Sequence, residues 1–235
     1  MKASIVIPAL NEERRLGGLL SDLAAQIRPP DEVLVVDAGS TDGTVEVARR
    51  FRRVEVLEAT PPVARGRNLG GMRSGGDVVV FFDADVRVRR DFLAGLLGEM
   101  ERRRLDVACP TYVPEGGANP AVRAFHAFFN ALIKAFEGAL PSGAGHCIAV
   151  RGDLFRESRG FDPGLKFDDI ELVRRLSRGR RFGVVGEKVY VSDRRYREDG
   201  TLNTFMRHLL MSVFFALGKF EWANRVEYEF GKHTS

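Results

Sequence analysis

The 235 residues are enough for one large α/β domain, and 44% apolar with 29% charged residues is typical of a globular protein with a sizeable core. The formal net charge of +4 is mildly basic, but the arginines are scattered along the chain and form no basic tail. The charge therefore gives no indication of a nucleic-acid-binding protein. No apolar run approaches the ~20 residues that a transmembrane helix needs.

The two cysteines, Cys109 and Cys147, are isolated, and neither belongs to a CxxC pair. This spacing argues against a disulfide framework or a zinc site and suits a reducing compartment. The sequence starts directly with a strand-like segment, without the pattern of a signal peptide. We therefore expect a cytoplasmic protein.

The first half of the chain alternates short apolar runs with segments of helical spacing. The predicted strands are Ser4–Ile7, Val33–Val36, Val54–Leu57 and Asp77–Phe82, and the predicted helices are Asn11–Gln26, Thr44–Phe51 and Arg65–Arg73. Strands that are apolar on both faces and alternate with helices predict a mixed, mostly parallel sheet flanked by helices. Ligands of such sheets bind beyond the carboxyl ends of the strands. The polar residues that follow Ile7, Val36 and Phe82 are therefore candidates for a binding site.

The second half is less regular. It predicts strands at Cys147–Val150 and Val184–Val191, and helices at Ala121–Leu140, Ile170–Leu176 and Thr201–Phe220. We expect one domain over residues 1–200, followed by an amphipathic helical appendage over residues 201–235. Core packing is the default role of apolar stripes on such helices. The basic residues of the last helix leave contact with an anionic membrane surface as an alternative.

The segment with the most chemical information is VVVFFDADV, in which Asp83 and Asp85 follow an apolar strand. Side chains two residues apart point the same way in extended backbone. Their mutual repulsion is tolerable when a divalent cation, Mg²⁺ or Mn²⁺, lies between them and a diphosphate. A solvated turn after a strand is the alternative interpretation of this pair.

Two more segments place polar groups at the same edge of the predicted sheet. In VVDAGSTDGT, Asp37 ends the second apolar strand, and a helix N-cap explains Asp42 and Thr44 but not Asp37. In SIVIPALNEE, the residues after the first strand could read a base. The absence of GxGxxG and of GxxxxGK[ST] argues against NAD, FAD and a phosphate-binding P-loop.

Five segments together resemble a family 2 glycosyltransferase: SIVIPALNEE, VVDAGSTDGT, ARGRNLGG, VVVFFDADV and GFDPGLKFDDIELVRRL. Their order and spacing extend the resemblance to about Gly200. The resemblance implies the GT-A fold, a nucleotide-diphosphate sugar as donor, and inversion at the anomeric carbon. Matched motif by motif, it implies nucleotide binding by Pro8, Ala9, Glu12, Asp37, Arg65, Asn68, Asp83 and Ala84, and Mn²⁺ or Mg²⁺ binding by Asp83 and Asp85. Many members carry a second acid where this chain has Ala38, which leaves the nucleotide open.

The stretch FDDIEL matches a late motif of the family in which the second acid removes the proton of the acceptor. The resemblance thus assigns Asp169 as general base, with Asp168 in place of a glutamate. The alternative is a cluster of acids that stabilises a helix start, because Asp168, Asp169 and Glu171 would all lie in the first turn. Three neighbouring acids raise one another's pKa, and a raised pKa suits a base.

Asp168 and three further residues are candidates for contact with the acceptor or the diphosphate. His146 lies in the glycine-containing segment GAGHCIAV, and Arg194 and Arg195 lie in a polar segment after the last predicted strand. An arginine there could stabilise the charge that builds on the leaving group. A structural histidine and a solvated basic loop are the alternatives.

The predicted activity is metal-dependent, inverting transfer of a hexose-like unit to a hydroxyl or to a lipid-linked phosphate. A nucleotidyltransferase is the nearest enzymatic alternative, but PALNEERRL lacks the glycine-rich loop that such enzymes carry after the first strand. A non-catalytic module that binds nucleotide sugars is the second alternative. The presence of Asp83, Asp85 and Asp169 speaks against it.

Overall fold

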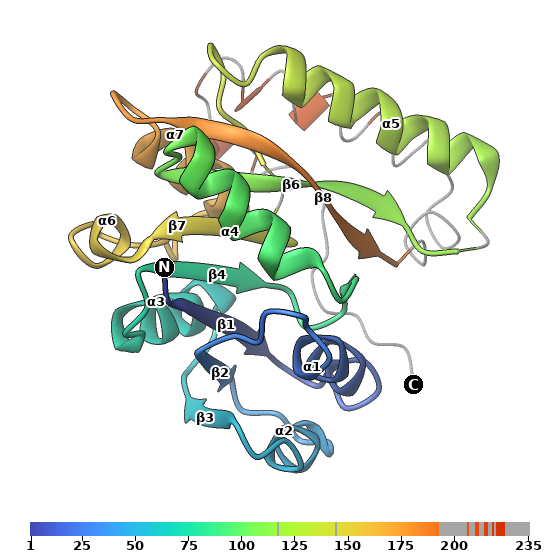
Figure 1. Cartoon of the computed structure of the whole chain (residues 1–235), viewed down its shortest axis with the longest axis vertical. Coiled ribbons are helices and arrows are strands. Elements are labelled where there is room, and N and C mark those ends of the chain that lie inside the picture. The colour runs from blue at the N-terminus through green and yellow to red at the C-terminus, as the bar shows by residue number, and fades with distance from the viewer. Residues whose placement is uncertain are drawn as a thin grey trace.

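The computed structural model describes residues 1–116, 118–143, 145–192, 206, 210–211, 214–215, 218 and 220–223. Eight strands form one sheet in the order β3-β2-β1-β4-β7-β6-β8-β5, with helices on both faces (Figure 1). The strands are β1 (Ala3–Ala9), β2 (Glu32–Asp37), β3 (Val54–Glu58), β4 (Val78–Phe82), β5 (Arg87–Val88), β6 (Val107–Pro114), β7 (Cys147–Arg151) and β8 (Phe182–Val191). The helices are α1 (Leu16–Ala24), α2 (Thr44–Arg49), α3 (Val63–Arg73), α4 (Phe92–Arg103), α5 (Pro120–Ala135), α6 (Gly152–Arg156), α7 (Asp168–Leu176) and α10 (Phe220–Ala223).

The sheet is mixed and mostly parallel, as predicted. Strand β1 pairs in parallel with β2 and β4, β2 pairs in parallel with β3, and β6 pairs in parallel with β8. Strand β7 runs antiparallel to both β4 and β6, so that Cys147 at its start lies beside Phe82 at the end of β4. The residue before β7 therefore meets the residue after β4.

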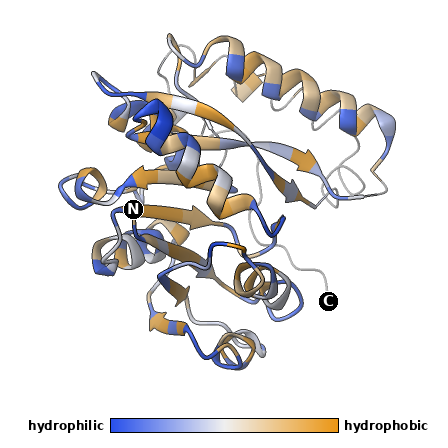
Figure 2. Cartoon of the chain, in the orientation of Figure 1, coloured by the Kyte–Doolittle hydropathy of each residue, from blue (hydrophilic) through white to orange (hydrophobic). Residues whose placement is uncertain are grey.

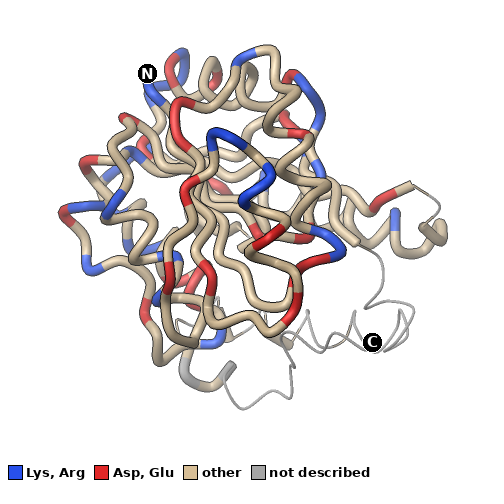
Figure 3. The backbone as a smooth tube through the Cα atoms, turned by 90° about the horizontal axis from the view of Figure 1, so that it is seen from below, with Lys and Arg blue, Asp and Glu red and all other residues tan. Residues whose placement is uncertain are grey.

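Both faces of the sheet are buried, which explains why the strands read as continuous apolar runs. Ile5 and Ile7 of β1 face one core, which α1 and α4 cover. Val6 faces the other core with Phe81 and with Phe155 of α6, under α3, α6 and α7. Figure 2 shows the strands as the most hydrophobic part of the ribbon. In Figure 3, acidic and basic residues are interspersed along the tube, in agreement with the scattered arginines of the sequence.

Helix α3 packs tightly against β1 and α6 because small residues form its inner face. A Cβ atom on Gly70 would come within 2.4 Å of Val6 Cγ1, and one on Gly71 would come within 2.2 Å of the Phe155 ring. Glycine alone allows this approach. The close packing brings Arg67, which shares this face, to the edge where β1 and β4 end.

The predicted helix Asn11–Gln26 starts later than expected, at Leu16. Asn11 has a left-handed φ of 56°, which a helix does not accommodate. The Glu12 N–H donates to Thr44 Oγ1 at the start of α2, and the Glu13 N–H donates to Asp42 Oδ2 in the loop before it. These groups therefore do not join a helix. The prediction was wrong at this end because tertiary hydrogen bonds replace the first helical turn.

Most of the predicted appendage over residues 201–235 lies outside the described residues. Residues 206, 210–211 and 214–215 are helical, and Met211 and Phe215 pack against Phe167 at the start of α7. The boundary at residue 200 stays a prediction. Within the described ranges, no helix combines the length and apolarity needed to cross a bilayer.

Candidate active site

The loops that follow β1 and β2, residues 10–15 and 38–43, hold each other through hydrogen bonds; we call them the β1–β2 loops. The Asn11 N–H donates to Ser40 Oγ at 2.9 Å, and the Thr41 N–H donates to Asn11 Oδ1 at 2.9 Å. The strand register places Pro8 beside Val36 and Ala9 beside Asp37. The predicted nucleoside contacts of the first two strands thus lie at one edge.

Asp37 shapes the second of these loops. Its side chain is buried and accepts the N–H groups of Gly39 and Ser40 at 3.0 Å each and the Ser40 hydroxyl at 2.5 Å. Gly39 has a φ of +89°, which a residue with a side chain rarely adopts. An acid at the end of this strand therefore has a structural role in fixing the turn, whatever it binds.

A second group of polar side chains meets around Arg67 of α3; we call Arg67, Asp83, His146, Asp168 and Asp169 the Arg67 cluster. Arg67 Nη2 lies 2.8 Å from Asp83 Oδ1, and Nη1 lies 3.2 Å from Asp168 Oδ1. His146 Nδ1 lies 3.0 Å from Asp83 Oδ2. The antiparallel pairing of β4 and β7 creates the last contact, and the Asp83 N–H donates to the His146 carbonyl at 3.2 Å.

The guanidinium of Arg67 is buried and lies 5.2 Å from the centroid of the Phe161 ring. Burial alone would lower the pKa of Arg67, but the charges of Asp168, Asp83 and Asp169 outweigh it and raise that pKa. One desolvated cation thus faces three carboxylates, so the net charge of the cluster is negative when all are ionised. Such a site attracts further positive charge.

The two acids at the start of α7 differ in access. Asp168 is 3% exposed, and its Oδ2 has no hydrogen-bond partner in the described part of the chain. Burial raises the pKa of Asp168 to about 7, and the charges of Asp169 and Asp83 add to this effect against Arg67. Asp169 is partly exposed and accepts the Ile170 N–H at 2.9 Å. Burial also raises the pKa of Asp169, so desolvation matters more than the mutual repulsion inferred from the sequence.

His146 and Asp83 stabilise each other's charged forms. Burial would lower the pKa of His146, but the hydrogen bond and charge of Asp83 raise it. Burial would raise the pKa of Asp83, but the His146 hydrogen bond and the Arg67 charge lower it. The His146 side chain is 41% exposed, so its ring can reach a bound molecule.

A divalent cation at this edge would rely on Asp83 and Asp85. Asp85 is partly exposed and follows buried Ala84, while both oxygens of Asp83 already contact Arg67 and His146. The described residues contain no group of three or more His, Cys, Asp or Glu arranged around a common metal position. Mg²⁺ commonly binds one or two carboxylates together with substrate phosphates. These two carboxylates fit such a cation as a partial ligand set that a diphosphate would complete.

The remaining predicted residues lie around these two groups. Arg65 is exposed and donates to Thr60 Oγ1 at 3.1 Å. Asn68 donates to the Phe161 carbonyl at 2.9 Å and accepts the Phe161 N–H at 2.7 Å, which fixes the loop before α7. Arg194 and Arg195 lie outside the described residues.

Sequence reasoning missed Arg67, the centre of the cluster. A signal was present, because Arg67 shares one helix face with Ala64, Gly70 and Gly71. A charged residue on the small-residue face of a helix is bound to be buried, and a buried arginine requires acids. Counting helix positions in ARGRNLGG could have found it.

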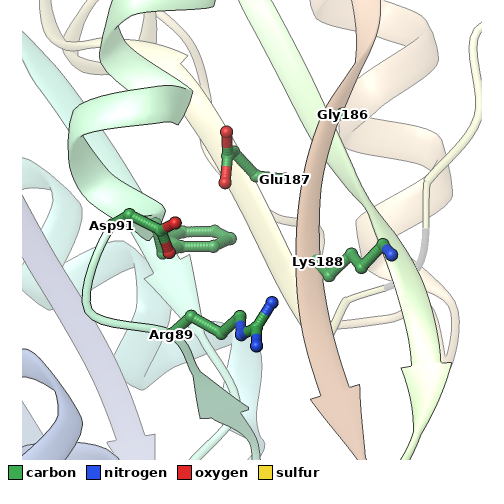
Figure 4. Close-up of a pocket in the computed structure, with 6 residues that line it drawn as sticks. Arg89, Asp91, Gly186, Glu187 and Lys188 are labelled. Atoms are coloured by element: carbon green, nitrogen blue, oxygen red, sulfur yellow. The ribbon is translucent and has the colours of Figure 1, made fainter.

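A small cavity of about 170 Å³ lies elsewhere, between the start of α4 and strand β8 (Figure 4). Its lining consists of Arg89, Asp91, Phe92, Gly186, Glu187 and Lys188. None of these belongs to the Arg67 cluster or to the β1–β2 loops. Its charged groups are of both signs, and we assign it no role.

Residues 4–158 match the model of Glycosyl transferase family 2. The chain belongs to this family. It is 32% identical over 115 residues to the uncharacterized glycosyltransferase YfnE of Bacillus subtilis, a match that covers 46% of the chain and 29% of that protein. It is 33% identical over 118 residues to the dodecaprenyl-phosphate galacturonate synthase of Rhizobium johnstonii, over 46% of the chain and 35% of that protein. These matches thus span about a third of each relative.

The solved structure of the mannosyltransferase PcManGT from Pyrobaculum calidifontis, in complex with GDP-Man and Mn²⁺, resembles the fold with a TM-score of 0.69 at 24% identity. The match covers 80% of the family 2 chain described here and 56% of that chain. This likeness confirms the predicted GT-A fold. The β1–β2 loops and the Arg67 cluster both lie at the sheet edge where this class of fold binds its ligands.

Proposed function

We propose that the chain is a metal-dependent, inverting glycosyltransferase that moves a hexose from a nucleotide-diphosphate sugar to an acceptor. The observation that carries the proposal is the meeting of Asp83, Asp168 and Asp169 around Arg67 at the end of β4, with His146 bonded to Asp83, in a chain of this family. PcManGT was solved with a nucleotide-diphosphate sugar and Mn²⁺, which supports this class of donor and cofactor.

The donor would lie across the edge of the sheet. Pro8, Ala9, Glu12 and Asp37 would form the nucleoside side, where the β1–β2 loops give a fixed shape. Asp83 and Asp85 would hold Mn²⁺ or Mg²⁺ against the diphosphate, and the cation would neutralise the charge that develops as the diphosphate leaves. Ala84 lies between these two acids and would contact the nucleotide. Arg65 and Asn68, both on α3, would also contact the nucleotide.

Asp169 would be the general base, and its contrast with Asp168 supports this assignment. Asp168 is almost fully buried and held by Arg67, whereas Asp169 is partly exposed beside Gly145. Asp169 would accept the proton of an acceptor hydroxyl while the hydroxyl oxygen attacks the anomeric carbon and the bond to the diphosphate breaks. A raised pKa brings a carboxylate closer to the pH at which a base works best.

The acceptor defines two variants of the reaction. A hydroxyl needs the base, but a lipid phosphate is already ionised and does not. One relative is named a dodecaprenyl-phosphate galacturonate synthase, which keeps the lipid-phosphate acceptor in the proposal. His146, beside Asp83 and partly exposed, would contact the acceptor or the diphosphate, and Arg194 and Arg195 stay proposed contacts of the same kind.

The first test is a thermal-shift panel of UDP-, GDP- and dTDP-sugars with and without Mn²⁺, followed by donor turnover. A ligand at 100 times its dissociation constant stabilises the folded state by about 2.7 kcal/mol. We expect a metal-dependent shift for one donor, lost in Asp85→Ala and retained in Asp91→Ala, which removes an exposed acid at the start of α4.

Turnover then separates the proposal from its alternatives. A shift without any release of nucleotide diphosphate, with all acceptors tried, would favour a non-catalytic binding module. Stabilisation that is equal in wild type and Asp85→Ala would refute the metal site. The absence of a shift with every donor would contradict the proposed substrate class.

A further inference from the structure

The C-terminal residues that the structure describes pack against the start of α7, beside the proposed base. Phe167, the residue at the N-cap of this helix, forms a buried cluster with Met211 and Phe215. The ring centroids of Phe167 and Phe215 lie 5.3 Å apart. Phe214 and Phe220 pack against these three residues from the same part of the chain. We call Phe167, Met211 and Phe215 the Phe215 cluster, to which the proposed reaction assigns no role.

Two residues of α7 itself extend this contact along one side of the helix. Ile170 packs against the Phe215 cluster. Arg174 Nη1 donates to the Phe215 carbonyl, and the guanidinium lies 5.5 Å from the centroid of the Phe220 ring. Ile170 and Arg174 are four residues apart and therefore lie on one side of α7. Because successive helix residues are rotated by about 100°, Asp169 points away from that side. The Phe215 cluster can thus affect Asp169 only through the position of α7.

Arg174 also joins the Phe215 cluster to the segment that leads to Gly145. Its Nε donates to the Pro141 carbonyl at 3.3 Å, while Nη1 donates to the Phe215 carbonyl. Burial lowers the pKa of Arg174, and among the described residues no carboxylate forms an ion pair with it. The guanidinium is thus desolvated to reach carbonyl groups of two segments that are far apart in the chain. The first of these segments continues to Gly145, whose backbone is hydrogen-bonded to Asp169.

The surroundings of Asp169 leave little room for a shift of the helix start. A Cβ atom on Gly145 would lie 2.8 Å from Asp169 Oδ2 and 3.1 Å from Arg67 Nη2. The neighbouring Asp168 contacts Arg67 at 3.2 Å. The N-cap residue, Phe167, makes no capping hydrogen bond through its side chain, so the usual polar anchor of a helix start is absent here. The first turn of α7 is therefore held by Arg67 on one side and by the Phe215 cluster on another.

We propose that the Phe215 cluster and Arg174 position Asp169 for proton transfer from the acceptor. They contact neither donor nor acceptor, and they act by fixing the first turn of α7 relative to Gly145. A displacement of a reacting group by about 1 Å can lower a rate about 10²-fold. The inference rests on the proposed role of Asp169 as base. It adds a role for the C-terminal residues, which lie outside residues 4–158 that match the family model.

The experiment measures donor hydrolysis by the full chain, with saturating Mn²⁺ and the donor that the thermal-shift panel identifies. Water attacks the anomeric carbon, Asp169 takes its proton, and the nucleotide diphosphate leaves and is quantified. Phe215→Ala and Arg174→Met should each lower kcat at least about tenfold. Phe215→Leu and Arg174→Lys, which keep an apolar side chain or a donor group, should lose less. The matched control Arg178→Met, which changes an exposed arginine just after α7, should keep the wild-type rate.

A double-mutant cycle separates positioning of the base from a general loss of structure. In the Asp169→Asn background, Arg174→Met should lower kcat less than about twofold, because the group that Arg174 positions is no longer a base. The KM for the donor and the metal-dependent thermal shift should be those of wild type in each single variant, since the proposed donor contacts lie on α3 and at the ends of β1, β2 and β4. A tenfold loss that persists in the Asp169→Asn background, or a lost thermal shift, would overturn the inference.

Circular dichroism at the assay temperature checks that each variant is folded, and if Phe215→Ala is not, Phe215→Leu and Arg174→Met decide the question. Folded variants of both residues that keep the wild-type kcat would overturn the inference and leave the proposed function intact. A wild-type kcat in Asp169→Asn would instead refute the proposed base, and this inference with it. Wild type that releases no nucleotide diphosphate with water or with any acceptor would contradict the proposed function itself.

Discussion

The β1–β2 loops and the Arg67 cluster lie at the same edge of one sheet, yet their polar groups are satisfied in different ways. In the loops, side chains such as Asn11 and Ser40 bond mostly to backbone groups of the neighbouring loop. In the cluster, charged side chains bond to one another, and one Asp168 oxygen has no partner in the described part of the chain. Hydrogen bonds to backbone groups fix the conformation of the loops, whereas the stability of each buried charge depends on the charges around it. A single substitution in the β1–β2 loops should therefore destabilise the protein less than a single substitution in the Arg67 cluster.

Asp169→Asn should show the largest effect. The amide cannot accept the proton of an acceptor hydroxyl, so kcat should fall about 10²–10⁴-fold. Folding should be preserved, because the change removes one of several carboxylates around Arg67. The measurement is the initial rate at saturating donor with a hydroxyl acceptor.

Glu171→Gln is the matched control, since Glu171 shares the first turn of α7 but pairs with Arg175 and Arg159. It should retain most of the wild-type rate. If the acceptor is a lipid phosphate, Asp169→Asn should cost little. An unchanged rate on a proven hydroxyl acceptor would refute the role of Asp169 as base.

Arg67→Met should cause the largest loss of stability. It leaves Asp83 and Asp168 without their cation, and removal of one partner from a buried ion pair costs about 3–5 kcal/mol. Arg65→Met, which changes an exposed arginine of the same helix, should alter the free energy of unfolding by less than about 1 kcal/mol. Urea denaturation near pH 8 gives both values. Equal losses in the two variants would show that the charges of the cluster are not coupled through Arg67.

The pH dependence of stability tests the same coupling at Asp168. Its pKa in the folded protein, about 7, is above its ordinary value of 3.8 because the carboxyl is buried. The folded state therefore binds this proton more tightly than the unfolded state. The stabilising contribution of the protonated carboxyl is complete below about pH 4 and is lost as the pH rises through about 7.

Asp168→Asn removes this dependence. Between about pH 5 and pH 8, the free energy of unfolding of the variant should rise relative to wild type, by a few kcal/mol at most, since one pKa unit corresponds to about 1.4 kcal/mol. Urea denaturation across this range measures the difference. Asp91→Asn should show no such trend. A difference that falls with pH would mean that Arg67 holds Asp168 ionised in spite of its burial.

Much of the fold could be predicted from sequence because its signals are local. Continuous apolar runs predicted β1 to β4, and Asp37 and Asp83 occur at the ends of their strands as expected. The start of α1 could not be predicted in this way, since the left-handed Asn11 and its bonds to the next loop are tertiary features. Helix α4 and strand β6 were not predicted at all.

The candidate site was predictable in its parts but not in its centre. The motifs indicated Asp83, His146, Asp168 and Asp169 separately. Their meeting depends on the antiparallel direction of β7 and on the glycines that let α3 approach the sheet. Neither is a local pattern, so Arg67, which joins the acids, became visible only in the structure.

Ser40→Ala should have the smallest effect and completes the comparison. The variant loses the hydrogen bond from the Asn11 N–H and the one to Asp37 Oδ1, while Asp37 keeps the N–H groups of Gly39 and residue 40. Backbone bonds therefore still define the turn. A hydrogen bond contributes about 0.5–1.5 kcal/mol net, so the loss should be near 1 kcal/mol and well below that of Arg67→Met in the same urea experiment. If Ser40→Ala instead destabilises the protein as much as Arg67→Met, the β1–β2 loops are as strongly coupled as the charges. In that case the hydrogen bonds of the loops contribute as much to the stability of the folded state as the ion pairs of the Arg67 cluster, in addition to fixing the conformation of the loops.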